Sequence, residues 1–431
     1  MKRGILLLVS LVLFFVVARS ATLFDNDSLN IVYSKGVAAF NNGKYSDAVK
    51  LWRNAAEGGH AMAQYDYGLS LYNGDGIEQN IDEAFSWFLK AAVQGLPDAQ
   101  FSVGYCCEFG YGIGISLPDA AEWYTMAASQ GYTDAECAAG ICHYSGIGVE
   151  VNYQIAVEWF KRAAQKDNAE AQSYLGTCYA NGYGVASDEV EAAKWYAKAA
   201  ENGSAEGAYN LGGCYEFGLG VESDWWIAMD LYEKAAEKGL AEAQYSLALC
   251  YFNEYMADDR KKALEWLNEA AVNGLSDAQY MLGLLYFEGN VVPKDVEKAV
   301  MWFSQAAEQG NADAQCDLGF CFLTGQGVAG NTGAALQWFM KSATQKNARG
   351  QHNMGVCYYE GLGVERSYEK AVEWFTLAAE QEFPDALYYL GVCHYNGQGV
   401  EKDQSKGLKL LRKAKQGGCK EAREALIILS E

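Results

Sequence analysis

The sequence predicts an all-α solenoid, a stack of antiparallel helix pairs, and two observations lead to this fold class. A block of about 36 residues recurs ten times between residues 60 and 418. Within each block, apolar residues follow helical spacing twice, which predicts two amphipathic helices, called A and B below. A block of this size cannot bury its apolar face alone, so successive blocks must stack against one another.

The first twenty residues have the pattern of a cleavable signal peptide. Lys2 and Arg3 precede an apolar run over residues 5–17, and small residues precede a cut after Ser20. The run is short for a membrane span, which needs about 20 apolar residues, although an uncleaved anchor is the alternative. We therefore expect residues 1–20 to be removed and the mature protein to be extracytoplasmic (secreted, periplasmic or in the endoplasmic reticulum lumen), with no integral membrane span.

The chain is strongly acidic, with a formal net charge of −22. Removal of Lys2, Arg3 and Arg19 with the signal peptide would make this −25. Such a field argues against nucleic acid and anionic membrane surfaces as partners.

Each block has the same internal pattern. Helix A carries Ala at position 4, Leu at position 8, Gly at position 9 and Cys or Tyr at positions 11 and 12. Helix B carries Ala at positions 25, 32 and 33 and Trp at position 28. Small residues let the helices approach closely, and Trp is expected to fill the gap between neighbouring repeats. Position 1 falls at His60, Leu96, Tyr132, Asn168, Ser204, Leu240, Leu275, Asn311, Asn347 and Phe383.

A Gly-x-Gly sequence follows helix A in eight blocks, for example Gly110 and Gly112. Glycine after a helix adopts a left-handed cap without a Cβ penalty. A glycine-rich loop can instead bind phosphate, but that motif follows a strand and occurs once. Eight copies between helices therefore predict interhelical turns.

The combined pattern Ala-x-x-x-Leu-Gly-x-x-Tyr-x-x-Gly-x-Gly-Val and Lys-Ala-x-x-Trp-x-x-x-Ala-Ala-x-x-Gly resembles the Sel-one-like repeat, a relative of the tetratricopeptide repeat. The resemblance covers residues 60–418 and implies a right-handed superhelix, with A helices on the concave face. It also implies a non-enzymatic adaptor in protein complexes. Residues 21–59 contain one ordinary tetratricopeptide-like pair, and residues 419–431 form a capping helix.

Two consecutive turns depart from the pattern. Residues 253–259 replace the glycine-rich loop in the block from Leu240, and the next block has only Gly289. These turns either change the superhelix curvature near residues 253–293 or have no consequence.

Eight of the twelve cysteines occupy position 11 on the buried stripe of helix A. Equivalent points on stacked helices are about 8–10 Å apart, whereas a disulfide needs Cα atoms within about 7 Å. We therefore expect buried, free thiols. Secreted relatives of the resembled family pair cysteines about eight residues apart, and some bind or slowly hydrolyse penicillins. That spacing is absent here, which disfavours the alternative function of a penicillin-binding or slow β-lactamase-type protein.

No catalytic or metal-binding constellation stands apart from the repeat. The four histidines occupy repeat positions that other copies fill with Tyr, Phe or Ser. Cys316, Cys321, His352 and Cys357 are zinc-like ligand types, but an i, i+5 pair diverges by about 140° on a helix. We expect no enzyme activity, no metal and no cofactor.

The expected binding surface is the concave side of the A helices, where positions 6, 10 and 13 place aromatic residues. An aromatic wall with an acidic rim suits a protein or peptide with basic charges and apolar anchors. Alternatively, positions 6 and 10 pack between adjacent A helices. Paired tryptophans at the start of one helix B are a separate candidate contact. The candidate partner-binding residues are Tyr65, Phe101, Tyr105, Tyr144, Tyr209, Tyr245, Phe252, Tyr280, Phe287, Tyr359, Tyr388 and Tyr395, with Trp225 and Trp226.

Overall fold

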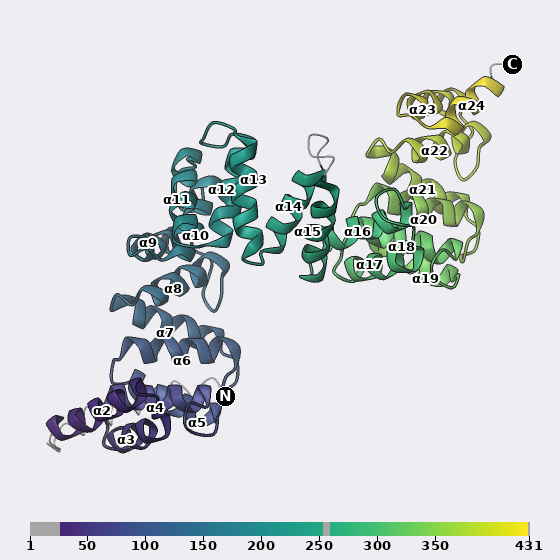
Figure 1. The fold of residues 1–431 in the computed structure, drawn as a ribbon. Helices are drawn as coiled ribbons and strands as arrows, with labels where there is room; N and C mark the ends of the chain where they lie inside the picture. Colours follow the sequence, from purple (N-terminus) through teal and green to yellow (C-terminus); the bar gives the residue numbers. More distant parts are fainter. Residues whose placement is uncertain (1–25, 253–258, 430–431) are drawn as a thin grey trace. The chain divides into compact units, whose positions relative to one another are not determined.

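The computed structural model describes residues 26–252 and 259–429, which form 23 helices with no strand among them (Figure 1). The predicted all-α fold is therefore confirmed. The predicted signal peptide and the irregular turn at residues 253–258 lie outside the described residues. The chain divides into two compact units, residues 1–235 and 236–431, here called unit 1 and unit 2.

Unit 1 contains six helix pairs. Its A helices are α2 (Asn26–Asn41), α4 (Ala61–Asn73), α6 (Pro97–Phe109), α8 (Thr133–Ser145), α10 (Ala169–Asn181) and α12 (Ala205–Phe217). Its B helices are α3 (Tyr45–Glu57), α5 (Ile81–Ala92), α7 (Leu117–Ser129), α9 (Tyr153–Ala164), α11 (Glu189–Glu201) and α13 (Trp225–Glu237). The last of these extends two residues beyond the division.

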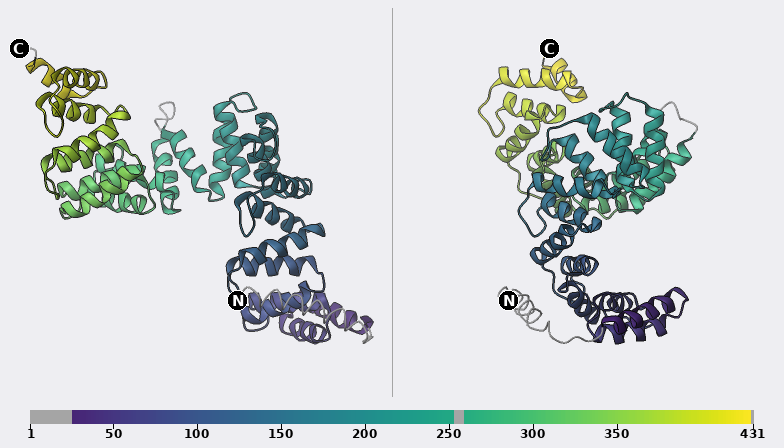
Figure 2. Two further views of the ribbon diagram at one scale, coloured as in Figure 1. Left: turned by 180° about the vertical axis from the view of Figure 1, so that it is seen from behind. Right: turned by 90° about the vertical axis from the view of Figure 1, so that its left-hand side faces the viewer.

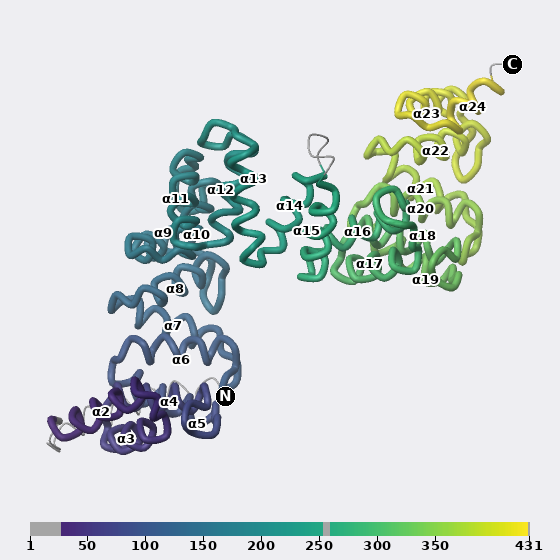
Figure 3. The backbone as a smooth tube through the Cα atoms, viewed as in Figure 1, coloured from purple at the N-terminus to yellow at the C-terminus, as the bar shows by residue number. Residues whose placement is uncertain are grey.

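Unit 2 contains five helix pairs and a terminal helix. Its A helices are α14 (Ala241–Phe252), α16 (Ser276–Glu288), α18 (Ala312–Thr324), α20 (Ala348–Glu360) and α22 (Pro384–Asn396). Its B helices are α15 (Arg260–Val272), α17 (Val296–Glu308), α19 (Thr332–Thr344), α21 (Tyr368–Glu380) and α23 (Gln404–Gln416), and α24 (Lys420–Ile428) follows. The backbone trace and two further views show the alternation of A and B helices (Figures 2 and 3).

Within a pair, the glycine at position 9 lies against the side chain at position 29 of helix B. A Cβ added at Gly68 would lie 2.8 Å from the ring of Phe88, and one added at Gly176 would lie 2.6 Å from the ring of Tyr196. The block from Leu240 instead has Ala248 at position 9, and its partner in the core is the smaller Leu267. The predicted close contact at position 9 is confirmed. In the exceptional block, the smaller Leu267 leaves room for the Cβ of Ala248.

The Gly-x-Gly loops are interhelical turns, as predicted. The first glycine caps helix A, and the second packs against the preceding repeat. Gly110 caps α6 in the left-handed region, with φ 78°, and its N–H donates to the carbonyl of Cys106. Gly112 also has a positive φ, 69°, and a Cβ there would lie 2.6 Å from the carbonyl oxygen of Ile81. The loop therefore rests on the first turn of α5 in the preceding repeat, where only glycine fits.

A buried glutamine at position 5 connects three helices at most joints between repeats. The side chain of Gln172 is completely buried, and its Nε2 donates to the carbonyl of Ala164 at the end of the preceding helix B, 3.1 Å away. Its Oε1 accepts from Nδ2 of Asn202 at the end of its own helix B, at 2.9 Å. The same relay forms at Gln64, Gln100, Gln244, Gln279, Gln315 and Gln351.

Two joints in unit 1 differ. Glu136 takes the place of the glutamine in one block and pairs with Lys166, with 2.7 Å between the carboxylate and Nζ. Ala208 takes that place in another block and has no side-chain amide to offer. The sequence analysis missed this relay, although an amide recurring 30 residues after the glutamine was the available signal.

The A helices of consecutive repeats also contact one another. α10 packs against both α8 and α12 in unit 1, and α20 packs against both α18 and α22 in unit 2. Within the described ranges, no B helices of consecutive repeats are packed as closely. In each of these stacks the A helices therefore lie on the inner side.

Replacing Gln172 with Met should lower the free energy of unfolding by about 1–3 kcal/mol, because it leaves the buried carbonyl of Ala164 without its hydrogen-bond donor. Urea denaturation followed by circular dichroism measures this change. The matched control is Gln154→Met at the exposed start of α9, which should change stability by no more than about 0.5 kcal/mol. Equal effects of the two substitutions would contradict the role of the relay.

Candidate protein-interaction surface

The predicted aromatic residues of helix A lie partly on the surface and partly on the core. Tyr65, Phe101, Tyr209 and Tyr280, at position 6, each contact the ring at position 29 of helix B, with ring centroids 5.4–5.9 Å apart. They are partly buried, as are Tyr144, Tyr245, Phe252, Phe287, Tyr359, Tyr388, Tyr395 and Trp225. Burying one face of each ring fixes its orientation and leaves part of its surface accessible.

Position 10 is more exposed than position 6. Tyr105 in unit 1 is 39% exposed, and Phe320 in unit 2 is 41% exposed. Leu249 has the same position and is 42% exposed. Large apolar side chains thus project from helix A in both units.

In unit 1, the ring of Tyr105 contacts two aromatic residues that the sequence analysis missed, Phe109 and Tyr111. Phe109 at the end of α6 is 50% exposed, and its ring centroid lies 4.7 Å from that of Tyr105. Tyr111, the middle residue of the Gly-x-Gly loop, stacks on Tyr105 at 5.8 Å and meets Tyr72 of α4 at 6.0 Å. We call Tyr72, Tyr105, Phe109 and Tyr111 the aromatic edge. An aromatic residue between the two glycines was the available signal.

A second aromatic group lies two repeats further along unit 1. Tyr144 of α8 contacts Tyr153, Tyr174 and Tyr183, with ring centroids 5.4–6.0 Å apart. Tyr183 again lies within a Gly-x-Gly loop and is 37% exposed. The loops therefore extend the aromatic surface of the A helices across repeat boundaries.

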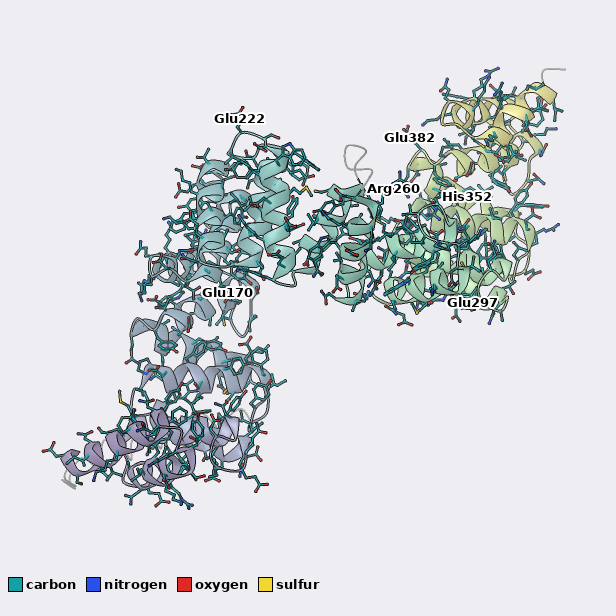
Figure 4. All side chains as sticks on the ribbon, in the orientation of Figure 1. Glu170, Glu222, Arg260, Glu297, His352 and Glu382 are labelled. Carbon is teal, nitrogen blue, oxygen red and sulfur yellow. The ribbon has the colours of Figure 1, made fainter. Side chains whose placement is uncertain are left out.

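The paired tryptophans form a separate apolar patch at the start of α13. Trp226 is 67% exposed, and its ring contacts that of the partly buried Trp225 at 5.0 Å. The carboxylate of Asp224 caps this helix by accepting from the N–H groups of Trp226 and Ile227. Figure 4 labels Glu222 in the preceding loop. Phe217 at the end of α12 is 69% exposed, and Leu219 within the loop is 41% exposed; both were also missed.

In unit 2, ionic contacts bridge the A helices of three consecutive repeats. The guanidinium of Arg349 in α20 pairs with the carboxylates of Asp317 and Asp313 in α18. Its Nη1 also lies 3.4 Å from the hydroxyl of Tyr280 in α16, and that hydroxyl donates to Asp317 Oδ2 at 2.9 Å. The candidate residue Tyr280 is thus part of a polar network.

The zinc-like candidate His352 packs among aromatic rings. His352 of α20, labelled in Figure 4, contacts the rings of Phe375, Phe383 and Tyr389. Burial lowers its pKa to about 4, so the imidazole is neutral near pH 7. Of the side chains that the structure describes, only Asp385, Cys419 and Glu421 bring three potential metal-ligand atoms within 4.8 Å of one another.

All twelve cysteines are buried, and none forms a disulfide within the described residues, as predicted for position 11. Burial raises the pKa of Cys178 and Cys393 to about 12. A buried thiol that remains protonated is a poor nucleophile and a poor metal ligand. These side chains therefore serve as small apolar core residues.

The comparisons with known proteins identify the family. The Sel1 repeat model matches eleven segments that cover residues 33–419 without a break, beginning with 33–60, 61–96 and 97–132. The chain belongs to the Sel1 repeat family, as the resemblance in its sequence indicated. The first matched segment falls in the pair that the sequence analysis described as an ordinary tetratricopeptide pair.

Solved structures similar to this chain include two Sel1 repeat proteins. One is the protective antigen c5321 of uropathogenic Escherichia coli, with 32% identity and a TM-score of 0.69 over 91% of this chain and 85% of that one. The other is a Sel1 repeat protein of Oxalobacter formigenes, with 33% identity and a TM-score of 0.51 over 72% of this chain and 89% of that one. No curated protein sequence matches this chain.

The family assignment has a general functional meaning. Sel1 repeats are protein-interaction modules, and solenoids of this family are generally non-enzymatic. Among the described helices, none combines the length and the apolar composition required to cross a membrane.

The native chain should react slowly with a thiol reagent at mildly alkaline pH, because burial limits access and disfavours the thiolate. After unfolding in denaturant without reductant, most of the twelve thiols should react. A colorimetric thiol titration of both states measures the difference, and a sample reduced before unfolding is the control. Recovery of almost no thiol from the unreduced sample would show that the cysteines are oxidised.

Proposed function

We propose that this chain is a non-enzymatic adaptor that holds protein partners on the A-helix side of its repeats, in an exported compartment. The observation that carries the proposal is the aromatic edge, where Tyr105 and Phe109 expose 39% and 50% of their surface on rings held in place by their neighbours. Rigid, partly exposed aromatic side chains are the usual anchors of protein interfaces. Their fixed orientation lowers the entropy cost of binding.

The charge around the aromatic edge favours a basic partner. Residues 61–160 contain 13 acidic residues and one basic residue, Lys90. The ammonium of Lys90 lies 3.4 Å from the ring centroid of Trp87 on helix B, so it does not offset the charge of the A helices. A basic segment with aromatic or aliphatic side chains complements this surface in charge and polarity.

The proposed compartment rests on the N-terminal sequence alone. Lys2 and Arg3, the apolar run over residues 5–17 and the small residues before position 21 have the pattern of a signal peptide. The proposed adaptor would then meet its partners outside the cytoplasm.

Removing two anchors of the aromatic edge should release partners that depend on it. We expect the double variant Tyr105→Ser, Phe109→Ser to lose such proteins in affinity capture, because each buried aromatic anchor contributes about 2 kcal/mol or more. Quantitative mass spectrometry measures the loss relative to the unmodified mature chain. The control is Phe217→Ser, Trp226→Ser, which removes two even more exposed rings, at the end of α12 and the start of α13.

The comparison separates the two patches. If only the Phe217→Ser, Trp226→Ser variant fails to capture a partner, the binding surface lies at the start of α13. If all three chains capture the partner equally, neither patch is the binding site. Circular dichroism should show the same helix content in each variant. Hydrolysis of nitrocefin by the purified chain would instead support the penicillin-hydrolysing alternative.

Expression of the complete chain should yield exported protein that begins at Ala21, because the signal peptide is expected to be cleaved after Ser20. N-terminal sequencing of the exported protein checks the cut. A matched chain with Leu8 and Leu11 replaced by Arg should stay in the cytosol, since charges interrupt the apolar run. Exported material that still begins at Met1 would indicate an anchor.

A further inference from the structure

The same tyrosine–aspartate pair occurs once in each unit. Position 7 of helix A is aspartate in only two blocks, at Asp66 and Asp317. In unit 2, the hydroxyl of Tyr280, at position 6 of the preceding repeat, donates to Asp317. In unit 1, Tyr33 has the corresponding place beside Asp66, and the two side chains line the same cavity.

The register of α2 shows that the two pairs are equivalent. Gly36 of α2 faces the indole of Trp52 in the way that Gly68 of α4 faces Phe88, which assigns position 9 to Gly36. Tyr33 is three residues earlier and so has position 6, like Tyr280 in α16. Both pairs therefore connect position 6 of one repeat with position 7 of the next.

In unit 2, a cation from the following repeat contacts both members of the tyrosine–aspartate pair. Arg349, at position 3, places its guanidinium against Asp317, whose side chain is only 16% exposed, and near the hydroxyl of Tyr280. A poorly solvated carboxylate is costly without such a partner. Arg349 thus supplies within the chain the cation that this arrangement requires.

Unit 1 has a second carboxylate at the equivalent place. Asp98 occupies position 3 of the repeat after Asp66, where unit 2 has Arg349. Burial and the nearby charge of Asp98 together raise the pKa of Asp66, while the hydroxyl of Tyr33 opposes the rise. Neither carboxylate forms an ion pair with any residue that the structure describes.

Asp66 also lines a cavity of about 260 Å³ between α2, α3 and α4. Rings of Tyr33, Phe40 and Trp52 form part of its wall. Trp52 is only 5% exposed, and its indole ring is held against Gly36 of α2. The wall thus combines the carboxylate of Asp66, which forms no ion pair with a described residue, with three aromatic rings.

We propose that Tyr33, Asp66 and Asp98, with the aromatic cavity wall, bind one arginine side chain of a protein partner in the arrangement that Arg349 has in unit 2. The planar guanidinium reaches a carboxylate and a tyrosine oxygen at the same time, as Arg349 does, whereas an ammonium is a compact point charge. The rings of the wall provide stacking surfaces for it. The site deepens the proposed adaptor function by naming the side chain that a partner presents at this end of the A-helix face.

The test places an arginine of the chain itself in this site. Asp98→Arg should bridge Tyr33 and Asp66, raise the melting temperature and weaken binding of a fluorescein-labelled peptide of alternating glycine and arginine by at least about tenfold. Glu242→Arg is the matched control, because it makes the same charge change at an exposed position 3 where the preceding repeat has Asn210 at position 7. Fluorescence anisotropy at constant salt measures the dissociation constants.

The reverse substitution should create a second site. Arg349→Asp removes the cation of unit 2 and leaves Tyr280 beside Asp317, Asp313 and the introduced carboxylate. We therefore expect one additional peptide to bind per chain, with circular dichroism confirming that the variant is folded. The same peptide with citrulline in place of arginine should bind neither chain, and its lysine counterpart should bind more weakly than the arginine peptide.

The outcomes distinguish this proposal from the adaptor function. Equal weakening by Asp98→Arg and Glu242→Arg would show that the peptide responds only to net charge and would overturn the arginine site. The aromatic-edge variant could still lose its partners in that case, because Tyr105 and Phe109 are unchanged in both chains. A peptide that binds the Asp98→Arg chain as tightly as the unmodified chain would also overturn the site.

Discussion

The contact between a position-9 glycine and the position-29 side chain sets the spacing of the helix pairs on which the stack is built, except in the block from Leu240, which has Ala248 and Leu267 there. A Cβ at Gly140 or Gly355 would lie 2.5 Å from the ring of its partner, Phe160 or Phe375, which is closer than carbon atoms can approach. The backbone of helix A therefore rests directly on an aromatic ring of helix B. Because each ring is fixed in this way, the alanines of helix B lie at the correct distance to receive the next repeat, and the core continues from repeat to repeat.

Polar contacts then determine how one repeat joins the next. The glutamine relay satisfies a carbonyl at the end of one helix B and joins it to the end of the next, in an interior where an unpaired polar group is costly. Glu136 and Lys166 replace this neutral relay with an ion pair, and Ala208 leaves its joint without an amide. Since a solenoid is stabilised by its nearest-neighbour contacts, such exceptions make the joints of this chain unequal.

The candidate binding residues occupy positions whose side chains are only partly buried by the packing of the repeats. One face of each ring at position 6 is held by helix B, whereas position 10 and the middle residue of the Gly-x-Gly loop project further outward. Asp66 and Asp317 occupy equivalent positions and differ in the residue at position 3 of the following repeat, which is Asp98 in unit 1 and Arg349 in unit 2. Arg349 neutralises a carboxylate in unit 2, whereas unit 1, with Asp98 at that position, leaves the partly buried Asp66 without an ion pair among the described residues.

The period of the sequence by itself determined the fold, because helical apolar spacing in every block permits only stacked helix pairs. It also identified the loops, the buried thiols and the family. The tertiary structure alone decided which aromatic side chains are accessible, since Tyr65 and Tyr105 both lie on helix A and differ in how far a neighbouring ring covers them. The partners of Gln172 and Arg349 are about 30 residues away along the chain. Their contacts exist only because stacking brings equivalent positions of successive repeats together.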